Sequence, residues 1–396
     1  MKNLLKGALL VSCVSMALVA HAQSNSEQGL LSPTGLITTG AAITEGGKAM
    51  IWGFRGSAQQ GNGVTAVSSS AAPTAVKSLN DLTNLATGAY HLIARDSSGN
   101  VYGWGQSGYG ETGCTGFYVN TPCKVMGNVQ QIAAGEYFSV AMTYDGGVYT
   151  WGHNLYGQLG NGASKNSSTP VKVNLNGETA RVIGGAYEGA FAVTYEGHVW
   201  AWGDNEASGL GFQGSNYGVQ RIVRTPTRAT ALEPFANHIT YIAGGNGWGE
   251  ALLDDGRVIG WGVRASLGVG VRSTSSSSPT PVVIMDNVKK LFARYVGSFA
   301  LTEGGTLGND VQMYTWGQTG GSAFPMIYGD APTLHYQRAA GDIVAIGGGK
   351  EHLFYMVETN TGKQVYGVGY NDLYKLNQSK CCAPNIEFFN LQRVVF

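Results

Sequence analysis

Two histidines occupy a repeated position that could support acid-base chemistry. His91 and His352 each follow a glycine by three residues, Gly88 and Gly349. An imidazole titrates near neutral pH and can act as a general base. The alternative is a structural side chain bonded to a neighbouring loop, which the recurrence favours. The sequence has no metalloprotease helix motif, Walker loop or G-x-S-x-G stretch beside them, so we predict no catalytic residue and no enzyme activity.

A glycine fingerprint at residues 103–108 could in principle bind a dinucleotide. Its spacing is G-x-G-x-x-G, from Gly103 to Gly108. Such a site also needs a helix whose amino terminus faces the pyrophosphate, and here the fingerprint follows a predicted strand and opens a loop. We therefore expect no nucleotide cofactor, and no cofactor of another kind.

Four cysteines could form disulfides or hold a metal ion. Cys114 and Cys123 are nine residues apart in one loop, and Cys381 and Cys382 are adjacent. Neither spacing matches a zinc site, and no histidine is clustered with them, so we expect no metal. We predict two disulfides, Cys114 to Cys123 and Cys381 to Cys382, as in an oxidising compartment.

The amino terminus has the layout of a secretory signal. Lys2 and Lys6 precede an apolar run from Ala8 to Ala20, and Ala20-His21-Ala22 is a small-x-small cleavage site. We expect cleavage after Ala22, a secreted or periplasmic protein, a short lead over residues 23–35 and one domain over residues 36–396. The apolar run is too short to span a bilayer, and no later stretch approaches the required length.

The charge balance argues against nucleic acid as a partner. The whole chain has 25 basic and 25 acidic residues, and the predicted signal contains two of the lysines. Phosphate binding needs clustered Lys and Arg, and the chain has no basic run.

The elements that must position these residues come from a repeat. A Trp-Gly dipeptide, or in the last copy Val-Gly, recurs at intervals of 47 to 59 residues. The seven copies begin at Trp52, Trp104, Trp151, Trp202, Trp261, Trp316 and Val368. Such a period is typical of circular or solenoid architectures. We expect the six tryptophans to pack in the core between blades.

Each repeat predicts about four short antiparallel strands. In the third copy, alternating apolar residues lead to a turn at Asp145-Gly146-Gly147, and a polar loop follows Trp151-Gly152. Similar Gly-containing turns recur in every copy, where a tight hairpin requires positive φ. The acids of these turns are accordingly interpreted as turn residues. The pattern indicates a propeller.

On these residues the chain resembles the regulator-of-chromosome-condensation repeat family. The stretch from Ile132 to Gly160, which ends in Gly157-Gln158-Leu159-Gly160, carries the resemblance most fully. It extends from about residue 36 to Phe396, with departures after Trp316 and at Val368. The resemblance implies an all-β, seven-bladed propeller of four-stranded antiparallel blades. The chain end, residues 390–396, aligns with the first strand of a blade, so we expect the N- and C-terminal strands to pair and close the ring.

The loops on one face of this propeller are rich in aromatic residues. Because connections in an antiparallel meander alternate between strand ends, the short Gly-x-x loops and the long loops after Trp-Gly share one face. The short loops offer Tyr90, His91, Tyr137, Phe138, Tyr187, Trp248, Tyr295 and His352. The long loops offer Tyr109, Phe117, Tyr118, Tyr156, Phe212 and Tyr217. Such a ring favours protein binding, although the same side chains could instead pack between loops.

These observations predict a monomeric, non-enzymatic scaffold that binds an unidentified protein through this face. Within the family, a secreted propeller that caps β-lactamases with an aromatic-rich face is the functional analogy. Two alternatives stay open. The family's nuclear member implies guanine-nucleotide exchange on a small GTPase, which here would require delivery into a host cell. A glycan-binding envelope or adhesion module would need paired aromatics and carboxylates on the same face.

Overall fold

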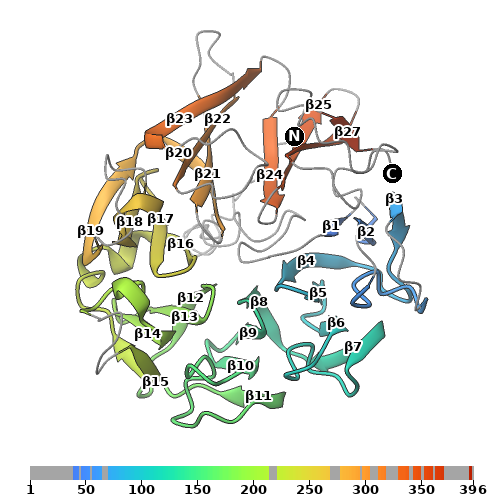
Figure 1. The fold of residues 1–396 in the computed structure, drawn as a ribbon, viewed down its shortest axis with the longest axis horizontal. Helices are drawn as coiled ribbons and strands as arrows, with labels where there is room; N and C mark the ends of the chain where they lie inside the picture. Colours follow the sequence, from blue (N-terminus) through green and yellow to red (C-terminus); the bar gives the residue numbers. More distant parts are fainter. Residues whose placement is uncertain are drawn as a thin grey trace, which may run out of the picture.

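The strands form small antiparallel sheets that are arranged in a ring (Figure 1). The computed structural model describes residues 39–43, 46–53, 56–64, 70–213, 221–267, 277–294, 297–303, 311–317, 329–338, 342–348, 352–359, 362–369 and 392–394. Within this part of the chain there are one three-stranded sheet and six four-stranded sheets, and every sheet is built from strands that follow one another in sequence. We call each sheet a blade.

The strand bounds repeat from blade to blade. The first two blades contain β1 (Thr39–Ile43), β2 (Ala49–Gly53), β3 (Ser70–Ala75), β4 (Leu82–Thr87), β5 (His91–Asp96), β6 (Val101–Gln106) and β7 (Tyr118–Met126). The next two contain β8 (Val129–Ala134), β9 (Phe138–Thr143), β10 (Val148–Gly152), β11 (Ser167–Lys172), β12 (Ala180–Gly185), β13 (Gly189–Thr194), β14 (Val199–Asp204) and β15 (Ile222–Arg228).

The remaining blades follow the same order. Their strands are β16 (Ile239–Gly244), β17 (Trp248–Leu253), β18 (Val258–Val263), β19 (Ser277–Met285), β20 (Val288–Arg294), β21 (Gly297–Glu303), β22 (Val311–Gly317), β23 (Gly329–Arg338), β24 (Asp342–Gly348), β25 (His352–Thr359), β26 (Gly362–Gly369) and β27 (Gln392–Val394). Three short 3-10 helices lie in connections, at Glu206–Ser208, Glu233–His238 and Arg264–Ser266.

Burial explains why the second strand of a blade is apolar along its whole length. All six residues of β9, and all six of β13, are buried, whereas the outer strand β11 has no buried residue. The second strand lies between neighbouring blades and packs on both faces, so its sequence does not alternate. The first strands lie toward the centre of the ring (Figure 1) and touch across blades. There the Gln131 side-chain amide exchanges two hydrogen bonds with the backbone of Ile183.

The predicted seven equivalent four-stranded blades, closed by pairing of the terminal strands, are wrong. The first sheet, β1-β2-β3, has three strands, and β27 pairs with β26 through Val365↔Val394, Tyr366↔Arg393 and Gly367↔Gln392. Within the described residues β1 pairs only with β2. The C-terminal strand therefore completes the last blade instead of the first. A segment as short as Gln392–Val394 fits any open antiparallel edge, so its sequence did not specify its partner.

The predicted signal, the cleavage site after Ala22 and the lead over residues 23–35 lie outside the described residues. Among the described residues, no helix has the length and apolar character needed to cross a membrane.

Candidate functional site

In the second, third and fourth blades the short and long loops are joined at one end of the strands, which we call the loop face. The backbone N–H of Gln106 donates to the carbonyl oxygen of Tyr90 at 2.9 Å, and that of His153 donates to Tyr137 at 2.9 Å. In the next blade Asp204 donates to Glu188 at 2.8 Å. These bonds recur where β6, β10 and β14 end. Each of these bonds fixes the position of a short loop against the long loop of the same blade.

The glycine after each tryptophan makes this junction possible. Gly152 has φ +110°, a conformation that side chains rarely adopt. A Cβ at this position would lie 2.5 Å from the Tyr137 carbonyl oxygen and 2.8 Å from the Phe138 Cα. Trp-Gly therefore recurs because another backbone segment passes close to the point where the chain turns from strand to loop. Only glycine fits at that point.

Five aromatic rings form a continuous row on the loop face. Ring centroids are separated by 6.3 Å between Tyr90 and Tyr137, 5.4 Å between Tyr137 and Tyr109, 4.5 Å between Tyr109 and His153, and 6.1 Å between His153 and Tyr156. These five residues, called the aromatic row, come from two neighbouring blades. All are partly or fully exposed, and Tyr109 is 40% exposed.

His153 is held neutral within this row. Burial lowers its pKa below the usual value, and its Nδ1 lies 2.9 Å from Nε2 of the Gln158 amide. An amide nitrogen can only donate, so Nδ1 is the acceptor and the proton of the neutral ring is on Nε2. At neutral pH His153 therefore contributes an uncharged ring to the aromatic row.

Carboxylates gather beside the end of the aromatic row. Asp204 and Glu206 lie 3.0 and 3.5 Å from the Arg221 guanidinium, which also lies over the Tyr156 ring, 6.0 Å from its centroid. Burial, and then the charges of Asp204 and Glu136, raise the pKa of Glu188 to about 8. The loop face therefore changes from aromatic to acidic between the third blade and the fourth.

A small pocket opens among these acids. Its volume is about 10 Å³, and its lining includes Tyr187, Glu188, Asp204, Glu206 and Asn246. We call it the acidic pocket. Below it Glu136, only 4% exposed, takes hydrogen bonds from the side chains of Tyr187 and Tyr137, and burial raises its pKa to about 7. In the described residues no group of three or more His, Cys, Asp or Glu side chains is placed to hold a metal ion.

Sequence-family models match the blades that carry this face. Models for the regulator of chromosome condensation (RCC1) repeat match residues 83–111 and 129–158, and residues 98–142 and 145–187. Residues 83–187 of this chain thus match RCC1 repeats. Protein pim1 of Schizosaccharomyces pombe is 29% identical over 297 residues, which is 70% of this chain and 44% of that protein. The chain thus spans less than half the length of this curated relative.

Solved structures agree on the fold. The crystal structure of Prp20p from Saccharomyces cerevisiae has a TM-score of 0.71 and 19% identity, over 97% of this chain and 90% of that chain. The structure of human WBSCR16 has a TM-score of 0.65 and 20% identity, over 82% and 85% of the two chains. At these identities the likeness concerns the propeller fold alone.

The structure divides the predicted binding residues of the short loops into two sets. Tyr90, Tyr137 and Tyr187 are partly exposed on the loop face. His91, Phe138 and Trp248 are 0% exposed, so the prediction that these three residues belong to an exposed aromatic ring is wrong. These three are the first residues of β5, β9 and β17, and their side chains are buried in the core. Tyr295, Tyr217 and the side chain of His352 lie outside the described residues.

His91 has a structural role. Its Nε2 lies 3.0 Å from Ser139 Oγ, and this hydroxyl donates to the Glu111 carbonyl oxygen at 2.8 Å. Burial lowers the pKa of His91 to about 3, so the ring is neutral and bonded to the neighbouring blade. The sequence held a signal for this: Phe138 and Trp248 occupy the same repeat position, and a position shared with large apolar residues is a core position.

The long loops also carry exposed apolar side chains. Phe117 is 57% exposed, Tyr118 51% and Leu155 54%, whereas Phe212 is only partly exposed. Phe117 and Tyr118 are stacked edge to face, with centroids 4.7 Å apart. Leu155 and the acids of the pocket were not predicted, because the prediction for the long loops rested on aromatic residues alone.

The first predicted disulfide is present. Cys114 and Cys123 are bonded with a Cα–Cα distance of 6.1 Å, and the bond ties the long loop of the second blade to β7. Cys381 and Cys382 lie outside the described residues. All six tryptophans of the Trp-Gly repeat are 0% exposed.

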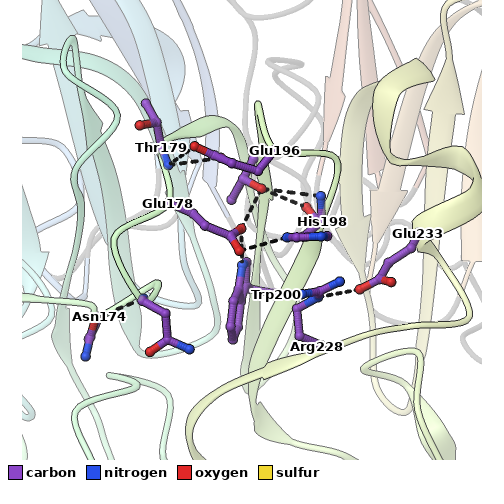
Figure 2. A network of polar contacts seen from close by, with 10 residues as sticks. Asn174, Glu178, Thr179, Glu196, His198, Trp200, Arg228 and Glu233 are labelled. Atoms are coloured by element: carbon purple, nitrogen blue, oxygen red, sulfur yellow. Dashed lines mark hydrogen bonds and ion pairs between the residues drawn. The ribbon is translucent and has the colours of Figure 1, made fainter.

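The opposite face carries a polar network that stabilises a blade connection (Figure 2). The Glu178 carboxylate accepts hydrogen bonds from Trp200 at 2.8 Å and Thr194 at 2.8 Å, and lies 2.7 Å from His198 Nδ1. In the same network Glu196 accepts from the Thr179 backbone N–H. The turn residues here hold the β11–β12 connection against the β13–β14 hairpin, as the turn geometry predicted.

Proposed function

We propose that this protein is a non-enzymatic scaffold that binds another protein through the loop face. The observation that carries the proposal is the aromatic row, extended by the exposed side chains of Leu155 and Phe117. Aromatic side chains bury large areas at low entropic cost, and they are enriched in binding hot spots. The row lies on a rigid base, because each loop is fixed by the backbone bonds between short and long loops.

The comparisons support a binding role without naming the partner. The structure of Prp20p is described together with its binding properties to Gsp1p and histones. Protein partners are accordingly reasonable for a chain with the same fold and RCC1 repeats. Guanine-nucleotide exchange on a small GTPase is the second candidate function, and the likeness to Prp20p favours it.

The proposal includes a location. The layout of the first 22 residues supports export and cleavage after Ala22, and the Cys114–Cys123 disulfide supports an oxidising compartment. N-terminal sequencing of the mature protein from periplasm and culture medium tests this. A protein that begins at Met1 in the cytoplasm would contradict it.

The binding proposal is tested with two matched variants. Tyr109→Ala with Leu155→Ala removes exposed apolar area from the loop face, and Tyr195→Ala removes a more exposed ring, 69% exposed, from the opposite face. We expect the double variant to lose capture of the native partner from envelope extract, since a central aromatic contributes about 2 kcal/mol or more. Tyr195→Ala should retain capture. Loss only with Tyr195→Ala would assign binding to the other face.

The same variants separate the two candidates. Purified protein is added to a small GTPase loaded with fluorescent GDP, and nucleotide release is followed with and without the double substitution. Acceleration of release that depends on Tyr109 and Leu155 would favour the exchange activity. Partner capture without any acceleration favours the scaffold.

A further inference from the structure

We propose that the partner presents a basic side chain, arginine or lysine, next to an apolar residue, and that the basic group binds at the mouth of the acidic pocket while the apolar residue lies on the aromatic row. This inference rests on the proposed function and specifies the chemistry of the partner. It depends on three features of the loop face: uncompensated carboxylates, a neighbouring aromatic surface and a guanidinium already bound in this setting.

The first feature is a charge imbalance. Glu136, Glu188, Asp204 and Glu206 act on one another electrostatically, and Arg221 forms the ion pairs at the pocket, with Asp204 and Glu206. Among the described residues Glu188 has no ion pair. Burial and the neighbouring acids raise the pKa of Glu188 to about 8, so this carboxyl group is mostly protonated at neutral pH in the free chain. A cation at the pocket mouth would favour its ionised form and bind as the proton leaves.

The second feature is continuity with the aromatic row. Tyr156 ends the row and interacts electrostatically with Glu188, Asp204 and Glu206. Tyr187 lines the pocket, and its carbonyl oxygen accepts the Glu136 N–H at 2.9 Å. A partner residue next to the basic one would therefore contact aromatic rings. The surface thus favours partners in which a basic and an apolar residue lie side by side.

The third feature is Arg221 itself. Its guanidinium is held between carboxylate oxygens and the face of the Tyr156 ring. This is the combination of charge and cation–π contact that recognises arginine. Asp204 and Glu206, which line the pocket, thus already bind a guanidinium, and Glu188 adds a further carboxyl group to the same lining.

The pocket is too small to enclose a whole side chain. Its volume of about 10 Å³ is that of one water-sized group. The basic group is therefore expected at the pocket mouth, where it keeps part of its hydration. Binding should weaken as salt rises, because pairs exposed to solvent are screened.

The test uses a random peptide library displayed on phage and selected on the immobilised full chain. We expect enriched peptides to share a basic residue beside an aromatic or aliphatic one. The best peptide is then synthesised with its basic residue replaced by a neutral analogue, citrulline for arginine or acetyl-lysine for lysine. Its affinity should fall about ten-fold or more.

Chain variants complete the test. At about pH 9, where Glu188 is ionised, Glu188→Gln should produce a similar loss, and Glu206→Gln is a second variant in case the first alters the fold. Asp254→Asn with Asp255→Asn removes two exposed charges from the opposite face and should leave affinity unchanged. Circular dichroism melts check that each variant is folded.

Failure of this inference differs from failure of the proposed function. Peptides that lose binding with Tyr109→Ala but not with the neutral analogue would overturn the basic-partner inference and leave the binding face in place. Peptides insensitive to both would contradict both. A selection in which basic peptides are not enriched over the starting library would also overturn the inference.

Discussion

The indole N–H of Trp202 donates a 2.8 Å hydrogen bond to the backbone carbonyl oxygen of Gln158, across the boundary between two blades. Equivalent bonds join Trp104 to Gln59 and Trp261 to Gly209. In these three repeats the tryptophan donates to the long loop of the preceding repeat, whereas the indole N–H of Trp151 makes no such bond. This relationship explains why Trp-Gly and the Gly-Gln-Leu-Gly type loop recur together along the chain.

Replacement of Trp202 should therefore weaken the contact between blades. Trp202→Ala removes a fully buried ring, and we expect the free energy of unfolding to fall by about 3–5 kcal/mol. Trp202→Phe keeps a ring but leaves the Gln158 carbonyl without its donor, for a loss of about 1–3 kcal/mol from that group. Urea titration followed by fluorescence measures both. Equal stability of Trp202→Phe and the parent would show that the hydrogen bond contributes nothing.

Two glycines with positive φ should respond differently to alanine. Gly177→Ala places a Cβ where no atom lies within 4 Å, so only the left-handed backbone is penalised, by about 1–2 kcal/mol. Gly152→Ala adds a clash with the Tyr137 carbonyl oxygen, and should cost about 1–3 kcal/mol more. Thermal melts of the pair measure the difference. Equal losses would mean that the short loop moves aside freely.

The Cys114–Cys123 bond should stabilise the second blade. A nine-residue separation predicts a contribution on the order of 2–3 kcal/mol. Cys114→Ala with Cys123→Ala should lower the melting temperature, and reduction of the parent should have a similar effect. Alkylation without reductant, followed by mass spectrometry, should find both thiols blocked in the parent. Labelling of Cys114 in most molecules would contradict the bond.

Glu250 should make stability depend on pH. Its side chain is 0% exposed, accepts from Ser298 Oγ at 2.5 Å, and burial raises its pKa from 4.5 to about 8. The folded chain therefore keeps a proton that the unfolded chain releases between about pH 4.5 and 8. Stability should fall as pH rises through this window, by up to about 1.4 kcal/mol per pH unit, and level off above it.

Glu250→Gln provides the comparison, because an amide resembles the protonated acid and does not ionise. The difference in unfolding free energy between Glu250→Gln and the parent should shift in favour of the variant as pH rises from 5 to 8. Urea titrations at several pH values measure it. A difference that is independent of pH would contradict the raised pKa.

The sequence by itself determined the repeat, the antiparallel blades and the Cys114–Cys123 bond. Trp-Gly, the Gly-containing turns and short apolar strands are local requirements of backbone conformation and burial, so a single repeat such as residues 132–160 shows them all. Tyr90, Tyr137 and Tyr187 were placed on the loop face correctly, since hairpin connectivity decides which loops share a face.

Only the tertiary structure decided which of those residues are exposed and which strands pair at the chain ends. Phe138 and Tyr137 are neighbours in sequence, yet one is buried and the other lies in the aromatic row, because only the strand residue faces the next blade. Glu188, Asp204 and Glu206 became one pocket through the packing of separate loops. Exposure and partner choice depend on what lies opposite a residue in space, which no local pattern records.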